Sequence, residues 1–218
     1  MKFELERQLT PIVVEWLVSQ GLDVKGELRT AWGICDLVAC ELDLKSVRTR
    51  HELRQTAPIA TPLRAEIFGL IPTETITEEQ IFQRFGNSLE TLVRKEIEHL
   101  VRGRYIFRTT FGTLYCRNNW RPIHRQLIEL KLRNVNEAIE QALNNRSFAD
   151  QSYIAVPHDV AARSRIRLKK KFEESGVGLI GVSDSCEVLI EPGPSATDVA
   201  LQLVIADRFW ASMSNNVA

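Results

Sequence analysis

The chain has 218 residues, of which 44% are hydrophobic, and a formal net charge of zero. This length and composition can fill the core of one large domain or two small ones without disulfides. The four cysteines form no C-x-x-C pair, no signal segment opens the chain, and no apolar run approaches the length of a membrane helix. We therefore expect a cytoplasmic protein with buried thiols and no membrane partner.

The charge is unevenly distributed along the chain. Residues 94–133 hold 10 Lys and Arg against 3 Asp and Glu, and the segments on both sides are net negative. Local positive charge of this kind is typical of contact with a polyanion. A solvated basic surface explains it equally well.

The first predicted element is an amphipathic helix that ends near Gly21, and a β-hairpin follows it. Glu6 shares the apolar arc of this helix, whereas Glu4 and Glu15 face the other way. This placement requires the helix to continue through Pro11; alternatively, residues 3–9 form a separate turn. The hairpin is predicted from two strand-like segments, 22–29 and 33–40.

The middle of the chain differs in character from its two ends. We interpret residues 45–62 as a linker and residues 63–120 as an insertion. A capping box at Thr77 predicts a helix to Gly86, and Ser88 is expected to cap a second helix that stops at Gly103. Two strand-like runs follow, 105–109 and 113–117, and the order helix, turn, helix, hairpin resembles a winged helix.

Residues 1–44 and 121–218 are expected to form one discontinuous α/β core, a mixed β-sheet flanked by helices. Its later elements are predicted in chain order as strand 127–132, helix 135–148, strand 152–156, helix 159–174, strands 178–183 and 187–191, and helix 198–213.

Polar residues on two of these strands could carry chemistry. Glu129 and Lys131 point to the same face of their strand because side chains alternate, and apolar neighbours make their burial costly. Asp36 is the lone acid of an otherwise uncharged strand. Converging carboxylates suit Mg²⁺, although an ordinary cross-strand ion pair and a hydrogen-bonded structural aspartate are the alternatives. On the next helix, Gln141 borders the apolar stripe and could orient water.

The ordered fragments resemble the PD-(D/E)XK nuclease superfamily, which has a restriction-endonuclease-like fold. The matching fragments are Glu6-x-x-Leu9-x-Pro11, Cys35-Asp36-Leu37-Val38-Ala39, Ile128-Glu129-Leu130-Lys131-Leu132 and Gln141-Ala142. Two features depart from the family pattern. No proline precedes Asp36, and 93 positions separate Asp36 from Glu129, which the insertion accounts for.

The resemblance implies a Mg²⁺-dependent (or Mn²⁺-dependent) DNA endonuclease acting in repair, recombination or defence. Asp36, Glu129 and Glu6 would hold the metal, Lys131 would orient water or stabilise developing charge, and Gln141 would assist. The expected DNA contacts are Arg94, Lys95, Arg102, Arg108, Arg117, Arg163, Arg165 and Arg167. A non-catalytic DNA-binding or regulatory protein that works through its winged-helix-like insert is the alternative, and an insert that forms a homodimer is a third.

Overall fold

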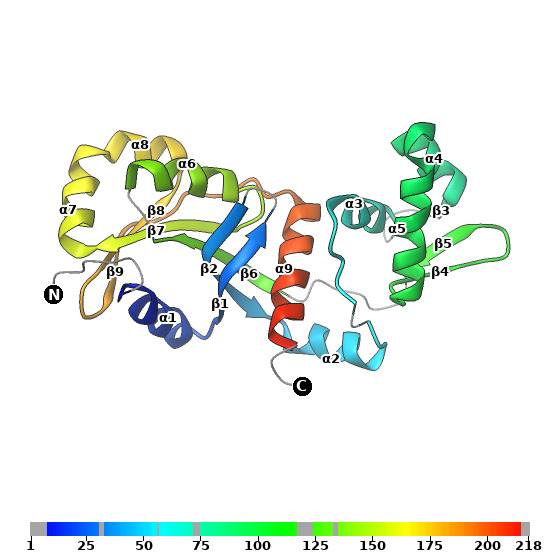
Figure 1. The fold of residues 1–218 in the computed structure, drawn as a ribbon, viewed down its shortest axis with the longest axis horizontal. Coiled ribbons are helices and arrows are strands. Elements are labelled where there is room, and N and C mark those ends of the chain that lie inside the picture. The colour runs from blue at the N-terminus through cyan, green and yellow to red at the C-terminus, as the bar shows by residue number, and fades with distance from the viewer. Residues whose placement is uncertain are drawn as a thin grey trace. The chain divides into compact units, whose positions relative to one another are not determined.

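The computed structural model describes residues 8–30, 33–55, 57–71, 75–116, 124–132 and 135–214. Within these ranges the chain is a mixed α/β protein with a six-stranded mixed sheet, a small three-stranded sheet and nine α-helices (Figure 1). Its contacts divide it into two units, residues 1–42 with 124–198, and residues 43–123 with 199–218. No helix in the described ranges is long and apolar enough to span a membrane.

The first unit is built on the six-stranded sheet, with strand order β1-β2-β6-β7-β8-β9. The strands β1, β2 and β6 form antiparallel neighbours, β6, β7 and β8 run parallel, and β9 returns antiparallel. Their bounds are β1 Asp23–Thr30, β2 Gly33–Leu42, β6 His124–Lys131, β7 Gln151–Pro157, β8 Gly178–Val182 and β9 Cys186–Ile190. The predicted mixed sheet and its opening hairpin are confirmed.

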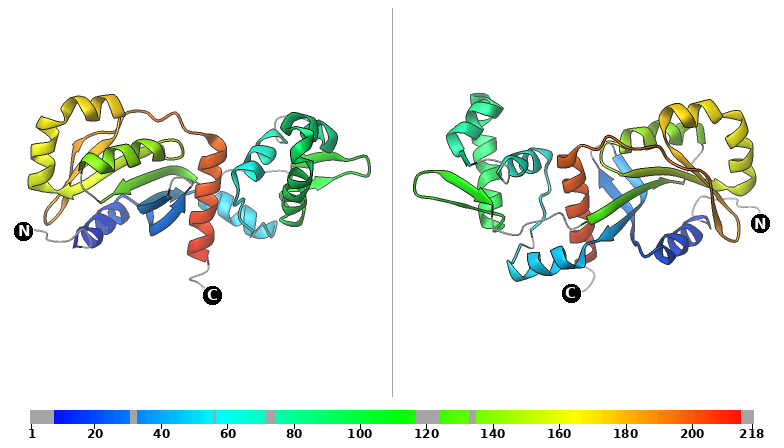
Figure 2. Two further views of the ribbon diagram at one scale, coloured as in Figure 1. Left: turned by 45° about the horizontal axis from the view of Figure 1, so that its top comes forward. Right: turned by 180° about the vertical axis from the view of Figure 1, so that it is seen from behind.

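Helices cover both faces of this sheet (Figure 2). Helix α1 (Thr10–Ser19) packs on one face through Leu9, Val13 and Leu17. The other face carries α6 (Val135–Asn145), α7 (His158–Arg167) and α8 (Lys169–Ser175). The parallel strands are therefore buried on both sides, as their nearly continuous apolar sequences require.

The sequence left the start of the first helix open, and one further element differs from the prediction. Helix α1 begins at Thr10 with Pro11 in its first turn, where a missing backbone N–H costs nothing. The single helix predicted over 159–174 is divided at Leu168, which leaves helical geometry and packs against the same core as Phe172.

The second unit begins with α2 (Leu44–Glu52), whose first turn is capped by the Asp43 carboxylate. Four further helices and the small sheet follow: α3 (Pro62–Leu70), β3 (Ile76–Thr77), α4 (Glu78–Phe85), α5 (Glu90–Arg102), β4 (Ile106–Arg108), β5 (Thr113–Cys116) and α9 (Val199–Ser214). The sheet order is β3-β5-β4, and the strands are antiparallel.

The unit boundaries differ from the predicted domains in two places. The stretch 45–62, interpreted as a linker, contains α2, and the C-terminal helix α9 belongs to the second unit rather than to the discontinuous core. The reason is packing: Leu203 and Val204 join the core formed by α3 and α5, and Trp210 packs with Val47.

Helix ends in the second unit follow local chemistry closely. Thr77 and Gln80 form the predicted capping box, with reciprocal side-chain and backbone hydrogen bonds. Helix α5 stops at Gly103, as expected. The predicted Ser88 cap is wrong, because a 3₁₀ turn over Asn87–Leu89 precedes α5. The N-cap position of α5 is Leu89, which makes no side-chain cap hydrogen bond.

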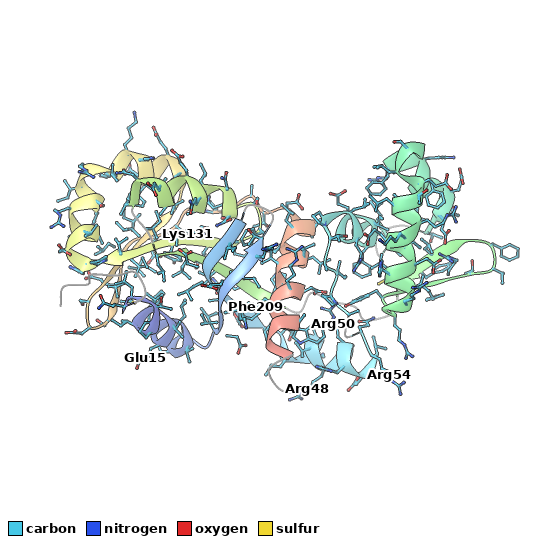
Figure 3. All side chains as sticks on the ribbon, viewed as in Figure 1. Glu15, Arg48, Arg50, Arg54, Lys131 and Phe209 are labelled. Carbon is cyan, nitrogen blue, oxygen red and sulfur yellow. The ribbon has the colours of Figure 1, made fainter. Side chains whose placement is uncertain are left out.

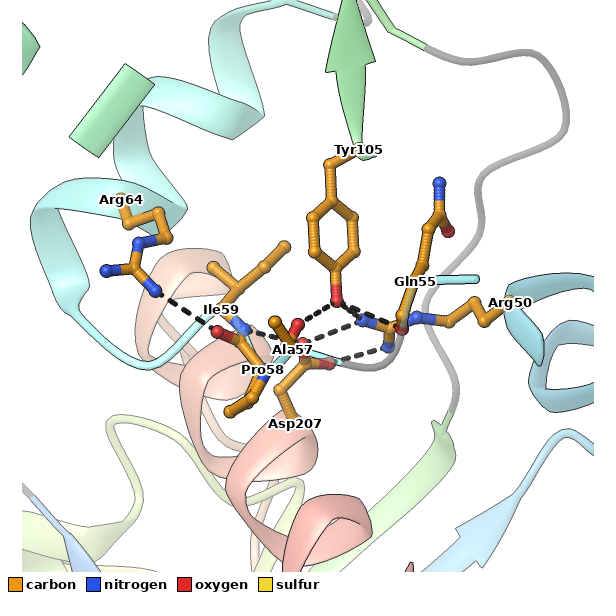
Figure 4. A network of polar contacts seen from close by, with 8 residues as sticks. All are labelled: Arg50, Gln55, Ala57, Pro58, Ile59, Arg64, Tyr105 and Asp207. Carbon is orange, nitrogen blue, oxygen red and sulfur yellow. Dashed lines mark hydrogen bonds and ion pairs between the residues drawn. The ribbon is translucent and has the colours of Figure 1, made fainter. Parts of the chain in front are cut away.

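A buried polar network ties α2, α9 and the segment before α3 together (Figure 4). Arg50 forms a bidentate ion pair with Asp207 at 2.7 and 2.8 Å, and its guanidinium also donates to Tyr105. Asp207 additionally accepts the backbone N–H of Ile59 at 2.8 Å. Both charged side chains are almost wholly buried, at 1% and 0% exposure.

The groups of this network shift one another's pKa values. Burial lowers the pKa of Arg50, but the hydrogen bonds and charge of Asp207 outweigh that effect and raise it above the ordinary arginine value. Burial, with the nearby Asp207 carboxylate, raises the pKa of Tyr105. The guanidinium therefore remains charged and the phenol neutral over the working pH range.

Asp207→Asn should destabilise the second unit by about 3–5 kcal/mol, since it leaves a buried guanidinium without its counter-charge. Urea unfolding monitored by circular dichroism measures this change. The double variant Arg50→Met/Asp207→Leu removes both charges. Its loss of stability should be much smaller than the sum of the losses in the single variants Arg50→Met and Asp207→Leu. Additive losses would contradict the coupling inferred for the pair.

Candidate active site

The candidate site lies on the face of the six-stranded sheet that carries α6. The strands β2 and β6 pair in a register that sets Val38 opposite Glu129 and Leu37 opposite Leu130. Continued by one residue, this register places Asp36 opposite Lys131. Because side chains alternate along each strand, Asp36 and Lys131 project from the same face, and the backbone position of Glu129, two residues before Lys131, belongs to that face.

Asp36 is held in place by the neighbouring strand. Its Oδ2 accepts the backbone N–H of Leu132 at 2.9 Å, and its Oδ1 lies 3.9 Å from the Lys131 Nζ. The Asp36 side chain keeps 17% of its surface exposed. The carboxylate is thus oriented by the backbone and still reaches solvent.

Lys131 is the buried cation of the site. Only 5% of its side chain is exposed, and its Nζ donates to the Ile34 carbonyl at 2.6 Å. Figure 3 labels it among the side chains of the first unit. An ammonium with so little water needs compensation, and the Ile34 carbonyl supplies a hydrogen-bond acceptor while the Asp36 carboxylate supplies the counter-charge.

A polar hollow of about 390 Å³ adjoins Lys131. Helix α6 contributes Gln141 to its wall, so the structure brings Gln141 and Lys131 to one space. The other lining residues, which the sequence did not single out, are Thr30, Gly33, Ile34, Asn144 and Asn145. Asn144 follows Gln141 by three residues and therefore shares its helix face, a spacing that could have revealed it.

Other predicted site residues lie partly or wholly outside the described structure. Glu6 precedes the first described residue, so its role stays a prediction. The backbone of Glu129 is described and its side chain is not. Glu15, assigned by the helical wheel to the outer side of α1, is exposed there (Figure 3).

The predicted DNA-contacting arginines of the second unit fall into two groups. Arg94 pairs with Glu90 at 2.8 Å and lies 3.6 Å from Glu78, and Arg108 pairs with Glu78 and with Glu98 at 2.7 Å. Lys95 and Arg102 are exposed on α5 without an ion-pair partner among the described residues. Arg117 lies outside the described ranges.

The three arginines predicted on the later basic run lie on α7. Arg163 pairs with Asp159 one turn earlier at 2.9 Å. Arg165 and Arg167 are exposed, and Arg165 borders a separate hollow of about 400 Å³ with Ile166 and Phe172. This hollow shares no lining residue with the one beside Lys131.

The residues that could hold a divalent ion are few. Among the described side chains, no group of three or more His, Cys, Asp or Glu converges on one point. Mg²⁺ requires only one or two protein carboxylates and keeps several waters. Asp36, with Glu129 diagonally opposite on the same face, matches that requirement in ligand type and position.

Comparison with known proteins returned no relative: no family model, curated protein or solved structure matches this chain.

Cys40 lies on the same strand and face as Asp36, four residues further along the chain. Burial, followed by the negative charges of Asp23, Asp150 and Glu41, raises its pKa to about 12. Burial also raises the pKa of Cys186 to about 11. These thiols stay protonated at neutral pH and cannot serve as nucleophiles there.

The raised thiol pKa values predict lower stability at alkaline pH. In the unfolded chain both thiols ionise near their ordinary value of 9.0, whereas the folded values are about 12 and 11. The stability that these thiols contribute is therefore fully present below pH 9 and is lost as pH rises from 9 through about 11 for Cys186 and about 12 for Cys40. Between pH 8 and pH 10 the urea midpoint should fall more for the wild type than for Cys40→Ala. An equal fall in both proteins would contradict the assignment.

Proposed function

We propose that the chain is a Mg²⁺-dependent endonuclease that hydrolyses DNA phosphodiester bonds. The observation that carries the proposal is the register of β2 and β6, which sets Asp36 beside Lys131 with Glu129 on the same face. Helix α6 adds Gln141 to the hollow beside Lys131. This is the constellation that the resemblance to PD-(D/E)XK nucleases implies.

The order of elements supports the same proposal. With the elements of the second unit set aside, the first unit runs α1, β1, β2, β6, α6 and β7, that is, a helix, three antiparallel strands, a helix and a parallel strand. In the resemblance, the acidic residue belongs to the second strand and the E-x-K tripeptide to the third. Asp36 lies on β2 and Glu129 and Lys131 lie on β6, which are the corresponding strands.

In this proposal Asp36 and Glu129 would hold the ion, with Glu6 as an expected further ligand. A bound Mg²⁺ would polarise the scissile phosphate and lower the pKa of a coordinated water. The Leu132 N–H keeps the Asp36 carboxylate in a fixed orientation. Lys131, anchored by the Ile34 carbonyl, would stabilise the charge that develops on the phosphate, and Gln141 would position the attacking water.

Asp36→Ala and Lys131→Ala should each lower DNA cleavage with Mg²⁺ or Mn²⁺ by at least about 100-fold, because each removes charge aimed at the transition state. Cleavage of linear, branched and single-stranded substrates gives the measurement. Gln20→Ala, an exposed change on the first unit, serves as control. If the wild type cleaves none of the three substrates and behaves as Lys131→Ala does, the nuclease assignment is refuted.

A second function is favoured by the second unit alone. The order α3, β3, α4, α5, β4, β5, with β5 between β3 and β4, matches the winged-helix arrangement expected for residues 63–120. On α5, Lys95, His99 and Arg102 form one exposed stripe. Arg94 and Arg108 pair with Glu78, Glu90 and Glu98, so these three acids do not offset the positive charge of the stripe, which suits phosphate contacts.

Lys95→Glu and Arg102→Glu should each weaken DNA binding by the full chain by roughly tenfold and reduce the dependence of affinity on salt. Titration of labelled duplex at several salt concentrations measures both quantities. The control Lys170→Glu changes an exposed lysine of α8 in the first unit. Unchanged affinity and salt dependence in both α5 variants would exclude this stripe as the DNA contact.

A further inference from the structure

The hollow beside Lys131 has an unusual lining for a site that handles only a phosphate. Its volume of about 390 Å³ is at the lower end of the roughly 300–1,000 Å³ typical of small-molecule pockets. None of its lining residues is acidic, and most of the residues that surround it are polar. The space therefore suits a ligand larger than a phosphate and not positively charged.

Two of the three carboxamide residues that line the hollow are exposed. Gln141 and Asn144 lie one turn apart on α6, and both are exposed into solvent. Neither side chain has a hydrogen-bond partner among the described residues. A carboxamide donates and accepts at once, which is the pattern required for bidentate hydrogen bonds to the edge of a nucleobase.

Ile34 adds an apolar surface to the lining of the hollow. Ile34 lines the hollow and keeps 52% of its surface exposed, although it belongs to a strand whose next residues are buried. The carbonyl of Ile34 also accepts from the Lys131 ammonium at 2.6 Å. Ile34 therefore both offers an aliphatic side chain and fixes the Lys131 ammonium through its carbonyl.

We infer that the hollow binds one nucleotide of the DNA strand with its base unpaired and unstacked. Lys131 would lie toward its phosphate, Ile34 would pack against the face of the base, and Gln141 and Asn144 would bond its edge. In an intact duplex both faces of each base are stacked and its Watson–Crick edge is paired. A base can therefore meet Ile34 with its face and the carboxamides with its edge only in a single strand or as an extruded nucleotide. The inference rests on the proposed function, which makes the ligand DNA, and it names the class of DNA that is bound.

Binding of labelled DNA to the full chain in EDTA tests the inference without cleavage. The three probes are a single strand, a duplex with one central mismatch and the matched duplex. Asn144→Ala should bind the single strand about tenfold more weakly, the effect of losing one bidentate contact to a base, and the matched duplex within about twofold of wild type. Gln20→Ala, an exposed carboxamide whose amide contacts only Ser19 in the described structure, should leave all three affinities unchanged.

Two comparisons separate the source of the nucleotide. Tighter binding of the single strand than of both duplexes identifies a single-stranded substrate, and tighter binding of the mismatched than of the matched duplex identifies an extruded nucleotide. Ile34→Ser should reduce the same affinities, because it removes the apolar face and keeps the backbone carbonyl. Thermal unfolding verifies that both variants are folded.

Equal single-strand affinity for wild type and Asn144→Ala would overturn the inference. So would cleavage of matched duplex in Mg²⁺ at a rate equal to that of single strand and insensitive to Asn144→Ala, which would leave the nuclease proposal intact. Conversely, single-strand binding that depends on Asn144, with no cleavage by any divalent ion, supports the nucleotide site and refutes the nuclease.

Discussion

The antiparallel pairing of β2 with β6 is the constraint on which the candidate site depends. It joins residues as far apart as Asp36 and Leu132, 96 positions along the chain, through a hydrogen bond from backbone to carboxylate. Side chains alternate faces in a strand, so a slip of one residue would move Asp36 to the opposite face from Lys131. The buried residues Leu37, Ala39 and Leu130, which belong to the core under α1, oppose such a slip.

The same pairing explains how a lysine can remain buried at the site. Lys131 has an apolar residue on each side in the sequence, and it would be expensive to bury without acceptors. The register supplies a carboxylate at 3.9 Å, and the start of β2 supplies a carbonyl at 2.6 Å. The polar hollow then extends from this cation toward α6, where carboxamides replace the apolar residues found deeper in the layer.

The second unit depends on a different interaction, the ion pair between Arg50 and Asp207. It connects a helix that precedes the insert with the C-terminal helix, and it also anchors the backbone at Ile59. Tyr105, between α5 and β4, donates to the Ala57 carbonyl and contacts Arg50. A buried charged network of this kind specifies one arrangement of α2, α5 and α9, since any other would leave charges unpaired.

Periodicity within single segments was sufficient to predict most elements, the capping box at Thr77 and the shared face of Glu129 and Lys131. These features depend on neighbours a few residues apart, which the sequence displays directly. Helix α2 was missed because its pattern is mostly polar, with Ser46 and Arg50 as its buried residues. Arg50 is buried only because Asp207 meets it from 157 positions away.

The sequence by itself determined which residues could share a face, and it identified the carboxylate, the E-x-K strand and the basic segment. Only the tertiary structure decided which of them meet. It placed Lys131 against Ile34 and Asp36, added Asn144 to the hollow, and engaged Arg94 and Arg108 in ion pairs that leave Lys95 and Arg102 facing solvent. The physical reason is that strand register and ion pairing join distant segments, and the periodicity of one segment carries no information about its partner.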